Sequence, residues 1–121
     1  METKSVVAVV DDDYRVLESL ESLLESAGHE VHGFASASAL LHSSVWRKLD
    51  LLISDIGMTG IDGFALQRRL QDDRPGVPVI FITGSANLLR QSEDESNDAL
   101  IFFKPFDAAR LLRAVDERLG R

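Results

Sequence analysis

The chain has 121 residues and a formal net charge of −7, and 45% of its residues are hydrophobic and 27% charged. These values indicate one globular domain with a buried core, expected over residues 1–121, rather than a disordered chain, and the negative charge argues against nucleic-acid binding by this domain. The sequence has no cysteine, no apolar run near the ~20 residues that cross a membrane and no signal peptide, so we expect a cytoplasmic protein with no membrane partner.

Short apolar runs alternate along the chain with longer segments of helical periodicity. The runs are of the kind found in strands covered on both faces, and they predict strands at 6–10, 30–34, 49–54, 79–83 and 100–103. The periodic segments predict helices at 14–27, 36–42, 64–72 and from Asp107 onward, whereas 87–98 is acidic and predicts at most a poorly anchored helix. Gly28 and Asp107 stand where a helix C-cap and N-cap are expected.

This alternation predicts an α/β fold, a doubly wound five-stranded parallel sheet with helices on both faces. Right-handed crossovers leave few topologies, and the flavodoxin-like strand order 2-1-3-4-5 is the common one at this size. In such a sheet, ligands bind outside the carboxyl ends of the strands.

Polar side chains stand where four of the five predicted strands end. They are Asp11, Asp12 and Asp13 after the first strand, Asp55 after the third, Thr83 at the fourth and Lys104 after the fifth. Because the carboxyl ends of parallel strands share one edge of the sheet, we expect most of these groups to lie together, with Asp13 instead capping a helix or solvated. If the acids only capped helices or faced solvent, no shared placement would be expected.

Oxygen ligands of this kind suit Mg²⁺, which keeps several waters and binds one or two carboxylates. Asp12 and Asp55 are candidates for direct ligands and Asp11 for a ligand through water. An aspartate can also act as a nucleophile toward phosphorus. Lys104 and Thr83 would then meet the phosphoryl oxygens through charge and a hydrogen bond.

Four stretches of the chain carry a resemblance to a known family. They are VVDDD at 9–13, LLISDIGMTGIDG at 51–63, VIFITG at 79–84 and FFKPF at 102–106. In order and spacing they resemble the receiver domain of two-component response regulators over nearly the whole chain. The run DDDYRVLESLESLLESAGHEV most resembles receivers joined to LuxR-type helix-turn-helix effectors, although no effector domain is expected within these residues.

The resemblance implies roles for individual residues and a cis Lys104–Pro105 peptide bond. The roles are phosphoacceptor for Asp55, direct magnesium ligand for Asp12, more remote ligand for Asp11, backbone-carbonyl ligand for Gly57, switch hydroxyl for Thr83 and phosphate-contacting lysine for Lys104. It also implies a sensor histidine kinase or phosphotransfer protein as donor. A downstream protein target or a separate effector domain would receive the output, and a homodimer is possible.

Three positions depart from the family pattern. Thr59 stands where proline is common, Ile101 occupies the aromatic switch position with Phe102 beside it, and the segment between Thr83 and Lys104 is about one residue short. The departures leave the phosphorylation chemistry intact and change the face that the family uses for dimerisation or docking.

The resemblance implies a phosphoacceptor switch and not an enzyme with continuous turnover. The same residues leave two alternatives open. One is a pseudo-receiver that binds proteins without phosphorylation, and the other is a magnesium-dependent phosphohydrolase, which would need a capping insertion and a general acid. The three histidines, including His29, lack metal-ligand spacing and are expected at the surface or half-buried. Trp46 is expected to pack against the core, and Asp62 to be a loop acid.

Overall fold

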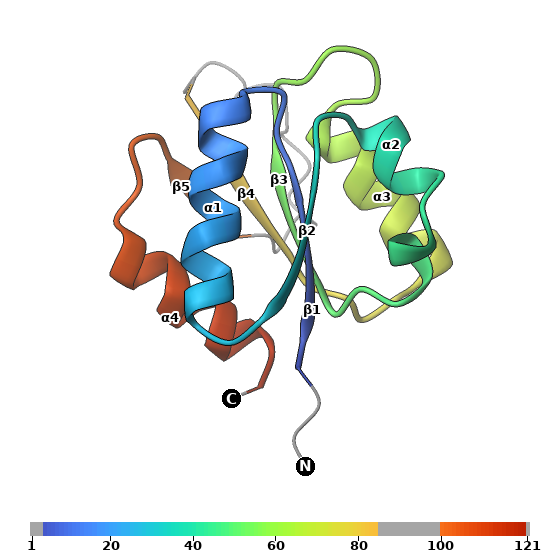
Figure 1. Cartoon of the computed structure of the whole chain (residues 1–121). Coiled ribbons are helices and arrows are strands. Elements are labelled where there is room, and N and C mark those ends of the chain that lie inside the picture. Colours follow the sequence, from blue (N-terminus) through green and yellow to red (C-terminus); the bar gives the residue numbers. More distant parts are fainter. Residues whose placement is uncertain (1–3, 85–99, 121) are drawn as a thin grey trace.

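The computed structural model describes residues 4–84 and 100–120, and its centre is a five-stranded parallel sheet (Figure 1). The strands lie in the order β2-β1-β3-β4-β5. Their bounds are β1 Val6–Val10, β2 Glu30–Phe34, β3 Leu51–Asp55, β4 Val79–Thr83 and β5 Leu100–Phe103. The predicted strand order is therefore confirmed. The predicted run at 49–54 includes Leu49, which lies outside β3 and is hydrophobic because it packs in the core.

Helices cover both faces of the sheet, as predicted. They are α1 Tyr14–Ser26, α2 Ala37–Leu41, the 3₁₀ helix η1 Ser44–Arg47, α3 Gly63–Asp73 and α4 Ala108–Arg118. Figure 1 shows α1 and α4 on one face and α2 and α3 on the other. The weak helix considered at 87–98 lies outside the described residues. Among the described helices, none is both long and apolar enough to cross a membrane.

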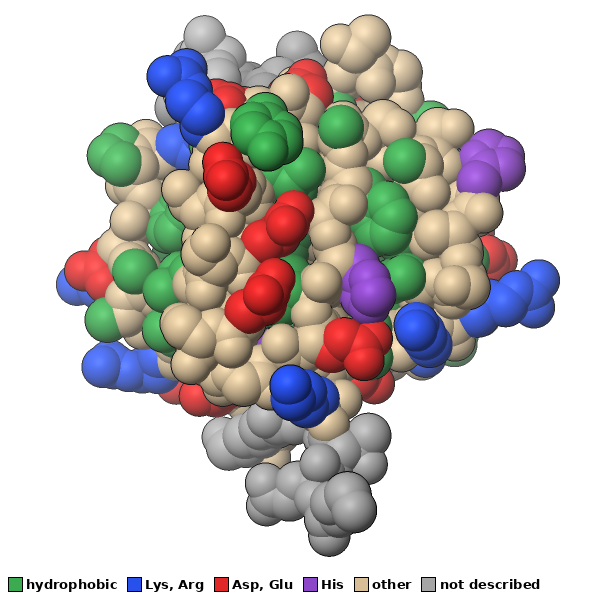
Figure 2. Space-filling view, in the orientation of Figure 1, with side chains coloured by type: hydrophobic (Ala, Val, Ile, Leu, Met, Phe, Trp, Pro, Cys, Tyr) green, Lys and Arg blue, Asp and Glu red, His purple; other side chains and the backbone are tan. Residues whose placement is uncertain are grey.

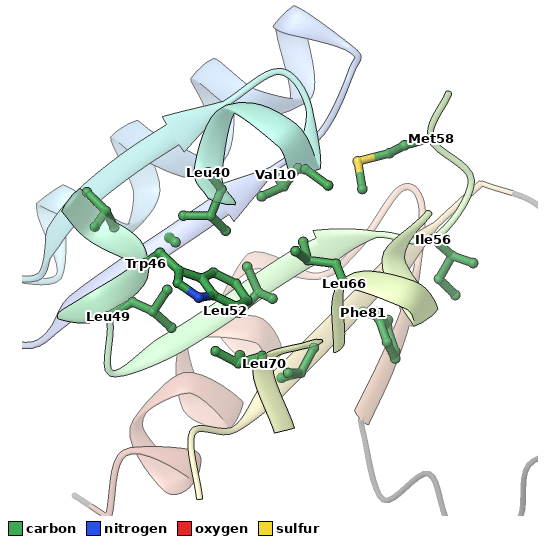
Figure 3. Close-up of a cluster of buried hydrophobic side chains, with 14 residues drawn as sticks. Val10, Leu40, Trp46, Leu49, Leu52, Ile56, Met58, Leu66, Leu70 and Phe81 are labelled. Carbon is green, nitrogen blue, oxygen red and sulfur yellow. The ribbon is translucent and has the colours of Figure 1, made fainter. Parts of the chain in front are cut away.

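The two faces of the sheet form two separate apolar cores, because successive side chains of a strand point to opposite faces. Val7 and Val9 of β1 pack with α1 and α4, and Ala8 and Val10 pack with α2, η1 and α3. The core between the sheet and α2, η1 and α3 contains Trp46, which is buried as predicted. This core is drawn in Figure 3. A continuous apolar run in β1 is therefore required, since both its faces are buried.

Aspartate side chains begin three of the helices. Asp13, Asp62 and Asp107 accept hydrogen bonds from the backbone N–H groups of Arg15, Ala65 and Arg110. The expectations for Asp13 and Asp107 are confirmed, and Asp62 has a larger role than that of a loop acid. After α1, Gly28 has φ +93°, a conformation that favours glycine and ends the helix.

The expectation for His29 is wrong. Its side chain is buried, and Nε2 lies 3.7 Å from Asp116 Oδ1 on α4. The turn after α1 packs against the last helix of the chain, and such a contact between distant segments leaves no periodic signal in the sequence.

Candidate functional site

Three carboxylates meet at the carboxyl ends of β1 and β3. Asp11, Asp12 and Asp55 each bring an oxygen to within 4.8 Å of the others. The register of the sheet explains this: Val10 pairs with Ser54, so the residues that follow these two arrive side by side. Asp11 and Asp55 are buried, and Asp12 is exposed. The predicted convergence of these residues is confirmed.

Lys104 brings a positive charge to the same place from the end of β5. Its Nζ lies 3.0 Å from Asp11 Oδ2 and 3.5 Å from Asp55 Oδ2. Its backbone N–H donates to the carbonyl of Thr83 (2.8 Å), which ties the ends of β4 and β5 together. The Lys104–Pro105 bond is cis, as the resemblance implied.

The buried charges change one another's pKa. Burial raises the pKa of Asp55, and the negative charge of Asp11 raises it further, while Lys104 and the Gly57 amide oppose the rise. Burial alone would lower the pKa of Lys104, but the close contact with the Asp11 carboxylate and its negative charge, together with Asp55, outweigh burial and raise it. The lysine therefore stays protonated beside the acids.

One ammonium does not neutralise three carboxylates, and this imbalance is what a divalent cation would correct. Asp11 Oδ1 accepts a hydrogen bond from the Asp13 N–H (2.8 Å). The other oxygen, Oδ2, is buried without an aligned hydrogen bond in the part of the chain described, and its contact with Lys104 is an ion pair. Clustered carboxylate oxygens with spare acceptor capacity fit the ligand preference of Mg²⁺.

The remaining predicted site residues lie around this cluster. Thr83 is fully buried at the end of β4. Gly57 donates its amide to Asp55, while the predicted role of its carbonyl stays a prediction. Thr59 is exposed in the loop before α3, whereas Met58 beside it is anchored in the core.

The two candidates for the switch position point to opposite faces. Ile101 packs with the α2 and α3 core, and Phe102 packs with the α1 and α4 core. Phe103, next along the strand, is half exposed. The two neighbours therefore cannot substitute for one another at a single position on one face.

Sequence reasoning missed two residues that touch the backbone of Asp55. The Ser54 hydroxyl donates to the Asp55 carbonyl (2.9 Å), and Gly63 at the start of α3 lies against the same carbonyl. The one signal for Ser54 was a hydroxyl within an otherwise apolar strand.

The fold and the site define a doubly wound α/β domain with an acidic cluster and a lysine at the carboxyl ends of its strands. Residues 7–116 match the family model described as the response regulator receiver domain, and the chain belongs to this family.

Individual relatives agree with this family. The chain is 37% identical over 113 residues to the response regulator protein TmoT of Ectopseudomonas mendocina, covering 93% of this chain and 51% of that protein. It is 32% identical over 120 residues to the transcriptional regulatory protein FixJ of Bradyrhizobium diazoefficiens, covering 98% of this chain and 58% of that protein. The chain thus spans about half the length of these curated relatives.

Solved structures show the same likeness. A response regulator receiver domain protein (CheY-like) from Methanospirillum hungatei JF-1 has a TM-score of 0.83 at 30% identity, covering 98% of this chain and 95% of that one. A signal receiver domain of an HD domain-containing protein from Pseudomonas fluorescens Pf-5 has a TM-score of 0.86 at 26% identity, with coverages of 98% and 96%. The domain is a response regulator receiver of two-component signalling, a signalling switch.

Proposed function

We propose that this receiver accepts a phosphoryl group on Asp55 in a reaction that requires Mg²⁺. The donor would be a sensor histidine kinase, a phosphotransfer protein or a small phosphodonor. The observation that carries the proposal is the surroundings of the Asp55 carboxylate, which has Asp11 and Asp12 within 4.8 Å and Lys104 Nζ at 3.5 Å.

In the proposed transfer, a carboxylate oxygen of Asp55 attacks the phosphorus atom of a phosphohistidine. The new O–P bond forms as the P–N bond breaks, and the electron pair of that bond stays on the imidazole of the donor. Ionised Asp55 is the reactive form, so the charges that raise its pKa must be balanced before an anionic donor approaches.

Asp12 and Asp55, the Gly57 carbonyl and, more remotely, Asp11 would hold the magnesium ion. When bound, the ion supplies positive charge against the carboxylates and a binding position for a phosphoryl oxygen. Lys104 already lies beside Asp55 and would contact the phosphoryl group, exchanging part of its ion pair with Asp11 for that contact. The hydroxyl of Thr83, at the end of β4, would follow the phosphoryl group.

The output would be a population shift between two conformers that changes partner binding near β5. Ile101 in place of an aromatic residue supports a change in how this face signals. The partner would be a downstream protein, a separate effector domain or a second copy of the domain. Acidic side chains gather over α1 (Figure 2), where Glu18 and Glu25 are exposed, and they favour basic partner surfaces.

Intact-mass spectrometry after incubation with acetyl phosphate and Mg²⁺ tests the proposal. We expect one phosphoryl adduct on the wild type, none without the metal and none on Asp55→Asn. Asp72→Asn, which removes an exposed carboxylate on α3, is the matched control and should be labelled like the wild type. No adduct under any metal would contradict the proposal and make the domain a pseudo-receiver, and continuous phosphate release from small phosphoesters would indicate a phosphohydrolase.

A further inference from the structure

Strand β3 lies between β1 and β4, and its pairing with β1 stops next to the backbone of Asp55. Leu52 and Ile56 of this segment donate their N–H groups toward β4, to the carbonyls of Pro78 and Ile82. Since alternate residues of a parallel strand face opposite neighbours, Asp55 directs its backbone groups toward β1.

The pairing with β1 ends one residue before Asp55. Its last pair is Val10 with Ser54, and beyond it the Asp11 N–H donates to the carbonyl of Phe34 on β2 (3.1 Å). The carbonyl of Asp55 therefore lies past the end of the ladder that would otherwise hold it, and a buried carbonyl needs a donor.

Ser54 supplies a donor. Its side chain is fully buried on the same side of β3 as Leu52, within the core covered by α3, and Oγ donates to the Asp55 carbonyl at 2.9 Å. A buried hydroxyl is unfavourable unless it is hydrogen-bonded. Its position in an otherwise apolar strand is thus explained by this one bond.

Gly63, at the start of α3, lies against the same peptide. A Cβ on Gly63 would lie 2.4 Å from the Asp55 carbonyl oxygen and 3.0 Å from Ile56 Cα. Its N–H donates to the carbonyl of Ile56 (3.0 Å). Because φ of Gly63 is not in the left-handed region, the requirement for glycine is the close approach of α3 to this peptide.

We propose that Ser54 and Gly63 are positioning residues for Asp55, and that they fix the peptide plane that aims its carboxylate at the phosphoryl donor. The inference rests on the proposed function of Asp55. If that peptide rotates, the Asp55 Cα–Cβ bond tilts and the carboxylate moves relative to Lys104. Small errors in the placement of reacting groups slow a reaction strongly.

Two substitutions of equal shape separate the hydroxyl from the packing. Ser54→Thr keeps the hydroxyl and adds a methyl group. Ser54→Val has the same shape as Ser54→Thr but carries a methyl group in place of the hydroxyl. With acetyl phosphate and saturating Mg²⁺, we expect labelling of Ser54→Val to be about tenfold slower than that of Ser54→Thr. Gly63→Ala should slow labelling by a similar factor, with α3 retained by circular dichroism.

Ser43→Ala is the matched control. The Ser43 hydroxyl also donates to a carbonyl, that of Leu40 (2.8 Å), and caps η1, which precedes the first residue of β3, whereas Asp55 is its last. Its loss should lower stability without slowing the labelling of folded protein. Equal labelling rates for Ser54→Val and Ser54→Thr would overturn the proposal.

A second readout needs neither metal nor phosphate. The ¹³C resonances of the Asp55 carbonyl and carboxyl carbons should move in Ser54→Val and stay near the wild-type positions in Ser54→Thr. If the wild type takes no phosphoryl group, the proposed function fails, and these resonances still decide whether Ser54 positions Asp55. Resonances unchanged in Ser54→Val would refute the role of the hydroxyl.

Discussion

Replacing Asp55 by asparagine is expected to stabilise the domain in the absence of metal. The change removes one charge from a cluster whose carboxylate oxygens lie within 4.8 Å of one another, where each repulsion is about 3.5 kcal/mol at an effective dielectric constant of about 20. The attraction of Lys104 at 3.5 Å is about 4.7 kcal/mol on the same basis. Water weakens the repulsion from exposed Asp12. The burial of the Asp55 charge adds a desolvation cost to the repulsion.

We therefore expect Asp55→Asn to raise the free energy of unfolding by about 1–2 kcal/mol without metal, or the melting temperature by about 4–8 °C. Magnesium should reverse the order. At a concentration about 100 times its Kd, a ligand of the folded state adds about 2.7 kcal/mol to the wild type. Asp55→Asn should gain much less, since it has lost a charged ligand.

Urea unfolding followed by fluorescence measures this difference, because Trp46 is the single tryptophan and is buried. The variants should be compared in EDTA and in Mg²⁺, with Asp72→Asn as the control for net charge. A wild type as stable as Asp55→Asn in EDTA would refute the repulsion, and equal gains from Mg²⁺ would refute the metal site.

The difference in stability between the wild type and Asp55→Asn should depend on pH. The pKa of Asp55 is raised in the folded domain, so the folded state binds this proton more tightly than the unfolded chain does. Ionisation of Asp55 therefore lowers stability as the pH rises through the raised pKa. The advantage of Asp55→Asn in EDTA should be greatest near pH 7 and should disappear once the pH falls below the ordinary range for aspartate, about 4.

Three further substitutions test the interactions around the site and the core. Lys104→Met leaves Asp11 and Asp55 without their ammonium and should lower stability by about 1–3 kcal/mol in EDTA, with a larger rescue by Mg²⁺ than in the wild type; an equal rescue would count against a shared charge cluster. Trp46→Phe loses the hydrogen bond from Nε1 to Asp73 (2.9 Å) and part of a buried ring, and should cost about 1–2 kcal/mol in urea unfolding followed by circular dichroism; no loss would show that the bond is exchanged for water at no cost. Asp62→Ala removes the N-cap of α3 and should cost about 1 kcal/mol by the same measurement, whereas Asp62→Asn should keep most of it.

The convergence of the acids and Lys104 could be predicted from the sequence because it depends on strand direction alone. Once β1, β3 and β5 are parallel, the residues after them share an edge, whatever the side chains elsewhere do. Helix starts were predictable for a similar local reason, since a capping aspartate bonds to an N–H two or three residues away.

Contacts between distant segments could not be predicted in this way. The burial of His29 depends on α4, which lies far along the chain and leaves no mark on the sequence around the histidine. Gly63 could be recognised in the sequence as a glycine near a helix start. The reason that glycine is needed there is that a Cβ would lie 2.4 Å from the Asp55 carbonyl oxygen, and this close approach exists only when α3 has docked on β3.

The end of a strand is a useful place for chemistry and a poor place for backbone hydrogen bonding, and both follow from the same geometry. Groups converge there because the parallel strands stop, and the last backbone groups lose their ladder partners for the same reason. In this domain the Asp55 carbonyl takes a donor from the side chain of its neighbour Ser54. Substitutions beside Asp55 should therefore disturb phosphorylation more than core substitutions of equal stability cost, because only the former act on the peptide that carries the carboxylate.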